Sequence, residues 1–134
     1  MRNFNYKKLD IYKISRELIV LIYKLTKEFP KDEHGLNGIV SQLRRAVISI
    51  SSNIAEGSSR KNKQQLHFLS LSHGSLREVD TQLEIAYDLE FITKKDIELL
   101  REKIDEMTAK LTNYMRRIDK EIIEEDQGKR PKQR

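Results

Sequence analysis

The residue pair best suited to act on a phosphodiester is Arg60 with His67. An imidazole can serve as a general acid or base, and a guanidinium can hold a phosphate group and its developing charge. Seven residues correspond to about two turns of an α-helix, so the two side chains would share a face if a helix already begins at Arg60. This pair keeps a metal-independent ribonuclease open as an alternative function.

Other catalytic and metal-binding patterns are missing from the sequence. His34, His67 and His73 lack the four-residue spacing that places two imidazoles on one helical face, and no Glu-x-x-His motif occurs. The chain also has no cysteine, no glycine-rich phosphate loop and no G-x-S-x-G motif. We therefore expect no metal site and no cofactor, and we expect that the protein is not an enzyme.

A ladder of polar residues runs beside an apolar stripe on one predicted helix. The polar positions are Gln42, Ser49, Asn53 and Glu56. The apolar positions, separated by three or four residues, are Val40, Leu43, Val47, Ile50 and Ile54. Polar groups next to a core cost stability unless they have partners, so we interpret the ladder as structural hydrogen bonding rather than catalysis. One four-helix core does not obviously need this second stripe, and we therefore predict a homo-oligomer.

Positive charge is concentrated in segments that are distant in the sequence. The formal net charge is +5, but residues 127–134 contain four bases and no acid, so residues 1–126 sum to only +1. Residues 57–77 contain bases without a carboxylate, whereas residues 78–90 contain acids without a base. In an antiparallel bundle the chain start, the turn between the second and third helices and the tail meet at one end. The predicted basic end consists of Lys7, Lys8, Arg60, Lys61, Lys63, Lys129, Arg130, Lys132 and Arg134.

Apolar residues recur at helical spacing over four segments, which predicts an all-α fold. The expected helices cover about residues 10–29, 38–56, 62–91 and 94–124. Short turns between four long helices favour an antiparallel up-down-up-down four-helix bundle. The bundle would form one domain over residues 1–126, and residues 127–134, which contain no apolar residue, are expected to be a disordered basic tail.

Local signals indicate where these helices begin and end. Pro30 stops the first helix, and Gly57 is expected to end the second in the left-handed conformation. Gly74 and Ser75 form a small-residue patch at which a neighbouring helix could approach closely. Two segments match the capping-box pattern of a helix start, Asn62 with Gln65 and Thr93 with Asp96.

The second helix carries a motif that resembles a known protein family. The run Q-x-R-R-A-x-x-S-I-x-x-N-I-A-E-G-x-x-R is typical of the small proteins encoded within intervening sequences of bacterial 23S rRNA genes. Two features depart from that family: Tyr12 stands where tryptophan is usual, and a longer turn after Glu33 leaves either Leu36 or Ile39 as the apolar anchor. The matching residues are Gln42, Arg44, Arg45, Ala46, Ser49, Ile50, Asn53, Ile54, Ala55, Glu56, Gly57 and Arg60, with Gly74, Ser75 and Glu78 further on.

This resemblance implies a four-helix bundle that assembles into a ring-shaped homopentamer, with the interface expected along the second and third helices. It also implies similarity to the accessory variability protein of diversity-generating retroelements, which is associated with nucleic acid and reverse transcriptase. The family has no well-established activity, so the resemblance informs the fold more than the function.

Together these observations predict a non-catalytic, oligomeric bundle that binds the backbone of RNA or DNA through its basic end, with a role linked to rRNA intervening sequences. A ring that binds a protein partner on its acidic end, without nucleic acid, is the alternative. The chain start MRNFNYKK has no hydrophobic signal core, and the longest apolar run, Leu18 to Tyr23, is too short to cross a bilayer. We therefore expect a cytoplasmic protein with no membrane contact.

Overall fold

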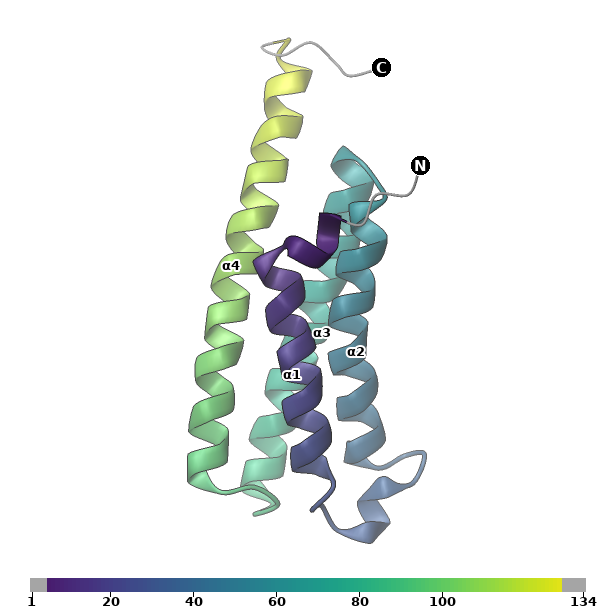
Figure 1. Cartoon of the computed structure of the whole chain (residues 1–134), viewed down its shortest axis with the longest axis vertical. Coiled ribbons are helices and arrows are strands. Elements are labelled where there is room, and N and C mark those ends of the chain that lie inside the picture. Colours follow the sequence, from purple (N-terminus) through teal and green to yellow (C-terminus); the bar gives the residue numbers. More distant parts are fainter. Residues whose placement is uncertain (1–4, 129–134) are drawn as a thin grey trace.

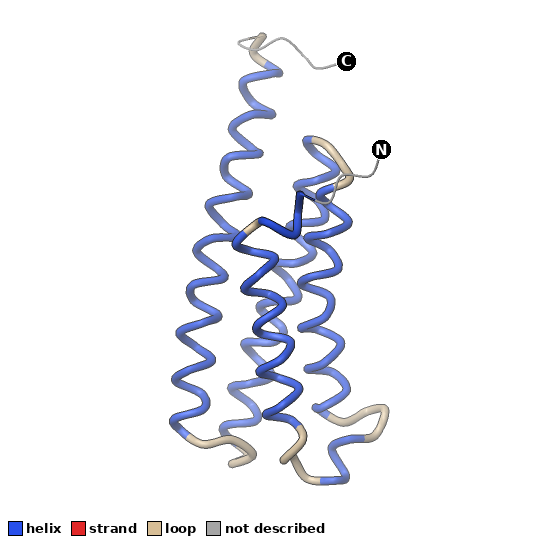
Figure 2. Tube along the Cα trace, in the orientation of Figure 1, coloured by secondary structure: helices blue, strands red, loops and turns tan. Residues whose placement is uncertain are grey.

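The computed structural model describes residues 5–128 and contains four long helices, which agrees with the predicted all-α fold. They are α1 (Asp10–Thr26), α2 (Ile39–Ser58), α3 (Asn62–Asp88) and α4 (Lys94–Asp126). Two short 3₁₀ helices, η1 (Asn5–Lys8) and η2 (Lys31–His34), precede α1 and α2. No strand occurs in this part of the chain (Figure 2).

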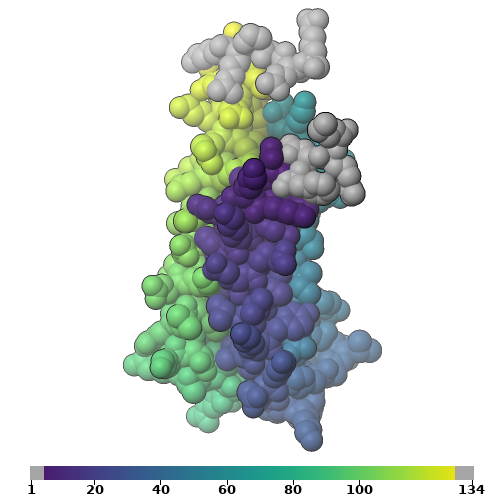
Figure 3. All heavy atoms as spheres, viewed as in Figure 1, coloured from purple at the N-terminus to yellow at the C-terminus, as the bar shows by residue number. Residues whose placement is uncertain are grey.

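The helices lie side by side, and their turns alternate between the two ends of the molecule (Figure 1). The turn between α1 and α2 and the turn between α3 and α4 lie at one end, whereas the turn between α2 and α3 lies at the other. Helix α4 extends past the α2–α3 turn, so its last turns rise beyond the other helices. In Figure 3, α1 occupies the middle of the visible face, with α4 on one side and α2 on the other.

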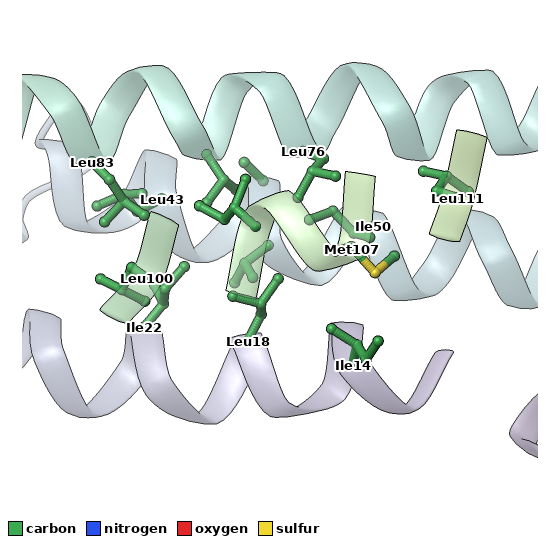
Figure 4. Close-up of a cluster of buried hydrophobic side chains, with 14 of the residues drawn as sticks. Ile14, Leu18, Ile22, Leu43, Ile50, Leu76, Leu83, Leu100, Met107 and Leu111 are labelled. Atoms are coloured by element: carbon green, nitrogen blue, oxygen red, sulfur yellow. The ribbon is translucent and has the colours of Figure 1, made fainter. Parts of the chain in front are cut away.

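A single apolar core lies between the four helices (Figure 4). Each helix contributes apolar residues to this core, because a spacing of three and four residues keeps side chains on one face. Leu18, Leu43, Leu83 and Leu111 are completely buried. Among the pairs of long helices in contact, α2 and α3 pack most extensively against each other, and α1 and α4 pack least extensively. Within the described residues, no helix is both long and apolar enough to span a membrane.

Helix α1 ends at Thr26, three residues before the predicted boundary. After Thr26 the backbone tightens, since the N–H of Glu28 donates to the carbonyl of Leu25 and that of Phe29 to the carbonyl of Thr26. The buried Phe29 ring then packs against Phe91 from the α3–α4 turn, with 5.5 Å between ring centroids. In the turn that follows, Leu36 is 86% exposed, and Ile39 packs against the core as the apolar anchor.

Gly57 does not end α2 in the left-handed conformation, so that prediction is wrong. It is buried inside the helix, which continues to Ser58, and its φ is not positive. A Cβ atom at this position would lie 3.1 Å from Cβ of Phe68 and 3.4 Å from the carbonyl oxygen of Gln65. Gly57 therefore permits the close approach of α2 to α3, a packing role that the local sequence did not indicate.

One of the two predicted capping boxes forms. Thr93 accepts a hydrogen bond from the backbone of Asp96, whose carboxylate in turn accepts one from the backbone of Thr93. The start of α3 is different, since its N-cap is Lys61, which makes no side-chain cap hydrogen bond. Asn62 instead has a φ of +53° and donates a hydrogen bond to a carboxylate oxygen of Glu125 at 3.1 Å.

Helix α3 ends three residues before its predicted boundary, in a turn with a left-handed glutamate. Glu90 has a φ of +64°, and the N–H of the next residue, Phe91, donates to the carbonyl of Ala86 at 2.9 Å. The N–H of Glu90 itself donates to the carbonyl of Tyr87. This pair of hydrogen bonds is a Schellman motif, formed here without the glycine that usually supplies the left-handed residue.

Candidate nucleic-acid interface

The polar ladder of α2 finds its partners within the same chain: Ser49 and Gln42 bond α3, whereas Asn53 and Glu56 have partners closer in sequence. Ser75 and Ser49 share a hydrogen bond of 2.9 Å between their hydroxyl oxygens, and Asn53 donates to both the hydroxyl and the carbonyl of Ser49. Gln82 donates weakly to Gln42 at 3.4 Å, which extends the ladder toward the other end of the bundle. These contacts explain the ladder within one protomer, so it does not by itself require a second copy.

The outward surface formed by α2 and α3 also exposes apolar side chains. Leu71, Glu78 and Ile85 recur every seven residues and therefore lie along one line of α3. Leu71 is 43% exposed and Ile85 is 44% exposed. The side-chain oxygen of Gln82 nearby is buried and has no hydrogen-bond partner among the described residues. We call this surface, with Leu71, Glu78, Gln82 and Ile85, the α2–α3 face.

The adjacent arginines of the α2 motif have different environments. The Arg44 guanidinium donates to the Thr26 hydroxyl at 3.0 Å and to the carbonyl of Tyr23 at 3.3 Å, and it stacks over the Tyr23 ring at 4.3 Å. Arg44 thus satisfies a carbonyl at the end of α1 and ties that end to α2. Arg45 is exposed and makes no ion pair or hydrogen bond within the described chain.

The cations of the predicted basic end come from the α2–α3 turn and from η1. Lys61 and Lys63 are exposed and have no carboxylate partner among residues 5–128. Arg60 is less available to bind a phosphate, because its guanidinium lies 3.8 Å from the Glu56 carboxylate and over the Phe68 ring. Lys7 and Lys8 belong to η1, which packs against both α1 and α2. Lys129, Arg130, Lys132 and Arg134 lie outside the described residues.

The same end of the bundle also carries acidic residues, which come from the end of α4 and were not part of the predicted basic end. Helix α4 runs past the α2–α3 turn, and its last turns contain Glu121, Glu124, Glu125 and Asp126. Glu125 and Asp126 line a cleft together with Lys61 and Lys63. The end of the bundle is therefore mixed in charge rather than uniformly basic, because the length of α4 brings its acidic terminus beside the basic turn.

The acidic half of α3 lies toward the other end of the bundle. Its Glu84 is paired with Arg101 of α4, and the hydrogen bond from that guanidinium lowers the pKa of Glu84. Burial raises the pKa of Asp80, and repulsion from Glu84 and Asp105 adds to this effect. The acids of residues 78–90 therefore do not cancel the charge of Lys61 and Lys63, which lie at the opposite end of α3.

A groove between α3 and α4 begins beside the basic turn, and sequence reasoning did not predict it. Its cavity volume is about 650 Å³. Leu66 and Met115 form an apolar floor, since both are partly buried and pack against the core. We call it the α3–α4 groove, and the residues that line it are Lys63, Leu66, His67, Ser70, His73, Thr112, Met115, Arg116 and Asp119.

The geometry that would let Arg60 and His67 share a helical face is not present. Helix α3 begins at Asn62, and the positive φ of that residue interrupts the helical path after Arg60. The structure instead brings His67 together with Lys63, four residues before it, and with Arg116 from α4. Only the packing of α3 against α4 places Arg116 there. Among the described residues, no group of three or more His, Cys, Asp or Glu side chains could hold a metal ion.

Comparison with known proteins finds a matching family and solved structures with a similar fold. The family described as 23S rRNA-intervening sequence protein matches residues 7–113. A solved structure from Bacteroides thetaiotaomicron, of a protein with unknown function from the S23 ribosomal protein family, superposes with a TM-score of 0.70 at 22% identity. The match covers 78% of this chain and 97% of that one, and at this identity it shows a common fold. No curated protein is significantly similar to the chain.

Proposed function

We propose that this chain, which belongs to the 23S rRNA-intervening sequence protein family, is a non-catalytic nucleic-acid-binding protein that acts in the cytoplasm as a homo-oligomer. The family name links the chain to rRNA intervening sequences. The nucleic acid is bound through its phosphate backbone, at the end of the bundle that contains the α2–α3 turn. RNA is the favoured ligand because of the family link, and DNA offers the same phosphate chemistry.

The observation that carries this proposal is the exposed, unpaired charge of Lys61 and Lys63. Neither ammonium group has a carboxylate partner within the described residues, so neither must break an ion pair to meet a phosphate. Binding of this kind gains free energy from the release of counterions and depends little on sequence. Lys8 and the four cations of residues 129–134 would add to the same interaction.

The proposed oligomer is a ring of antiparallel up-down-up-down bundles that meet along the α2–α3 face. Exposed Leu71 and Ile85 favour this surface, because apolar side chains grouped on one face gain free energy when a partner covers them. The family resemblance points to five copies. A ring would repeat the cations on one rim and raise avidity.

The proposal is tested by measuring binding of an RNA over a range of salt concentrations. Reversal of Lys61 and Lys63 to Glu is expected to weaken binding and to reduce the slope of log Kd against log salt by about two. The control reverses Lys94 and Lys95, which are exposed at the opposite end of α4. Deletion of residues 127–134 should weaken binding further.

Undetectable binding at low salt would contradict the proposal, as would binding that neither change affects. In that case the alternative function, a ring that binds a protein partner, would replace the proposed nucleic-acid binding. Cleavage of the RNA that is lost in His67→Ala would instead support the ribonuclease alternative.

A further inference from the structure

We infer that the α3–α4 groove receives an unpaired base of a single-stranded nucleic acid. This inference rests on the proposed nucleic-acid binding and specifies its ligand. It adds a site for the base to the sequence-independent contacts that the exposed cations would make with phosphates.

The size and floor of the groove suit a nucleobase. Its volume of about 650 Å³ lies within the usual range of small-molecule sites. Leu66 and Met115 provide an apolar floor that a flat heterocycle can cover. The Met115 thioether is polarisable and adapts to irregular shapes, which favours contact with rings of different size.

Three flat side chains surround this floor. His67 and His73 come from α3, and Arg116 comes from α4. Unstacked bases of single strands commonly stack on imidazole rings and guanidinium planes. Bases inside a duplex are already stacked and paired, so they could not reach the floor without being flipped out.

The charges of the groove indicate how a strand would be oriented. Lys63 lines both the groove and the cleft at the α2–α3 turn, so one strand can contact the exposed cations with its phosphates and enter the groove with a base. Asp119 is the only carboxylate among the described residues that line the groove. Because Asp119 repels phosphate but accepts hydrogen bonds from amino groups, we place the base beside it.

The first test compares a single-stranded RNA of about 12 nucleotides with the same RNA annealed to its complement, by fluorescence anisotropy at one low salt concentration. The single strand is expected to bind more tightly. Ser70→Phe fills the groove from an exposed position without changing its charge, and it should weaken binding of the single strand by about five- to 100-fold. Binding of the duplex should hardly change.

Two matched controls separate the groove from the rest of the surface. Thr81→Phe places the same ring at an exposed position of α3 that does not line the groove, and it should leave binding unchanged. Arg116→Ala should weaken binding of the single strand more than Arg117→Ala, because Arg117 lies over Tyr114 on the other side of α4. Circular dichroism and light scattering verify that each variant folds and assembles like the unmodified protein.

The outcomes distinguish this inference from the proposed function. If the unmodified protein binds RNA but the duplex binds at least as tightly, or if Ser70→Phe has no effect, the groove is not the base site while nucleic-acid binding stands. If the unmodified protein binds neither RNA at low salt, both proposals are overturned. A groove that instead binds a peptide, with no preference for single strands, also overturns the inference.

Discussion

At the scale of single residues, two helical glycines have opposite environments. Gly57 of α2 is buried and faces Phe68 and Gln65 at distances that leave little space for a side chain. Gly74 of α3 is exposed, and no atom would lie within 4 Å of a Cβ added to it. The close helix approach that we had predicted at Gly74 therefore occurs at Gly57 within the protomer. Ser75, the other member of that patch, does contact α2 through Ser49.

The two glycines give a matched pair of substitutions. Gly74→Ala is expected to stabilise the fold by about 1 kcal/mol, because alanine has the higher helix propensity and the site is open. Gly57→Ala should instead destabilise it by about 1 kcal/mol, since Cβ of Phe68 is attached to the backbone and cannot move without shifting α3. Urea unfolding measures both changes. A stabilising Gly57→Ala would show that α2 and α3 can separate easily, and a destabilising Gly74→Ala would indicate that another copy covers that position.

At the scale of elements, polar contacts fix how α1 sits against α2. The Ser15 and Ser51 hydroxyls are buried and share a hydrogen bond of 2.7 Å, and Arg44 binds both Thr26 and the carbonyl of Tyr23 at the end of α1. These contacts specify the lengthwise alignment of the two helices, because a shift by one turn would leave buried polar groups without partners.

We expect Arg44→Lys to lower the free energy of unfolding by about 1 kcal/mol, although the charge is kept. Lysine has no planar group to stack on Tyr23 while also donating to two acceptors. Arg45→Lys is the control, since Arg45 is exposed on the next position of the same helix, and it should change stability by less than about 0.5 kcal/mol. Equal effects in thermal or urea unfolding would mean that the contacts of Arg44 contribute little.

At the scale of the whole molecule, two surfaces with exposed apolar side chains are candidates for the proposed interface. Leu71 and Ile85 belong to the α2–α3 face, and Leu99 lies beside Leu21 in a shallow cleft between α4 and α1. The cleft between α1 and α4 is flanked by Glu102 and Glu106. Glu78 also lies between Leu71 and Ile85, but the cleft between α1 and α4 is lined by two carboxylates and by Lys103. Burial of that cleft would remove more charge from water, so we place the proposed interface on the α2–α3 face.

Leu71→Glu is therefore expected to dissociate the proposed oligomer at micromolar concentration, because it buries a charge at the interface without touching the core. Leu99→Glu introduces the same charge on the other surface and should leave the assembly intact. Light scattering after size-exclusion chromatography measures the mass of both variants. The interface is misplaced if Leu99→Glu dissociates the oligomer and Leu71→Glu does not, and a monomeric unmodified protein would contradict oligomerisation itself.

The sequence by itself determined the four helices and the residues of their core. The α2 stripe that contains Leu43, Ile50 and Ile54 is buried as its spacing predicted, because helical periodicity depends only on local geometry. The capping box at Thr93 was also predictable, since both of its partners lie within one turn. Residues of the candidate site that lie close together in sequence, such as Lys61 and Lys63, could be predicted in the same way.

Only the tertiary structure decided the features that depend on two helices at once. The role of Gly57 follows from its distance to Phe68, and the α3–α4 groove exists because Arg116 and Met115 pack opposite His67 and Leu66. The mixed charge at the end of the bundle has the same origin, since it depends on how far α4 extends past Lys61. Periodicity fixes which face of a helix is buried. How closely two helices approach and how they align lengthwise are set by side-chain packing between segments far apart in the chain.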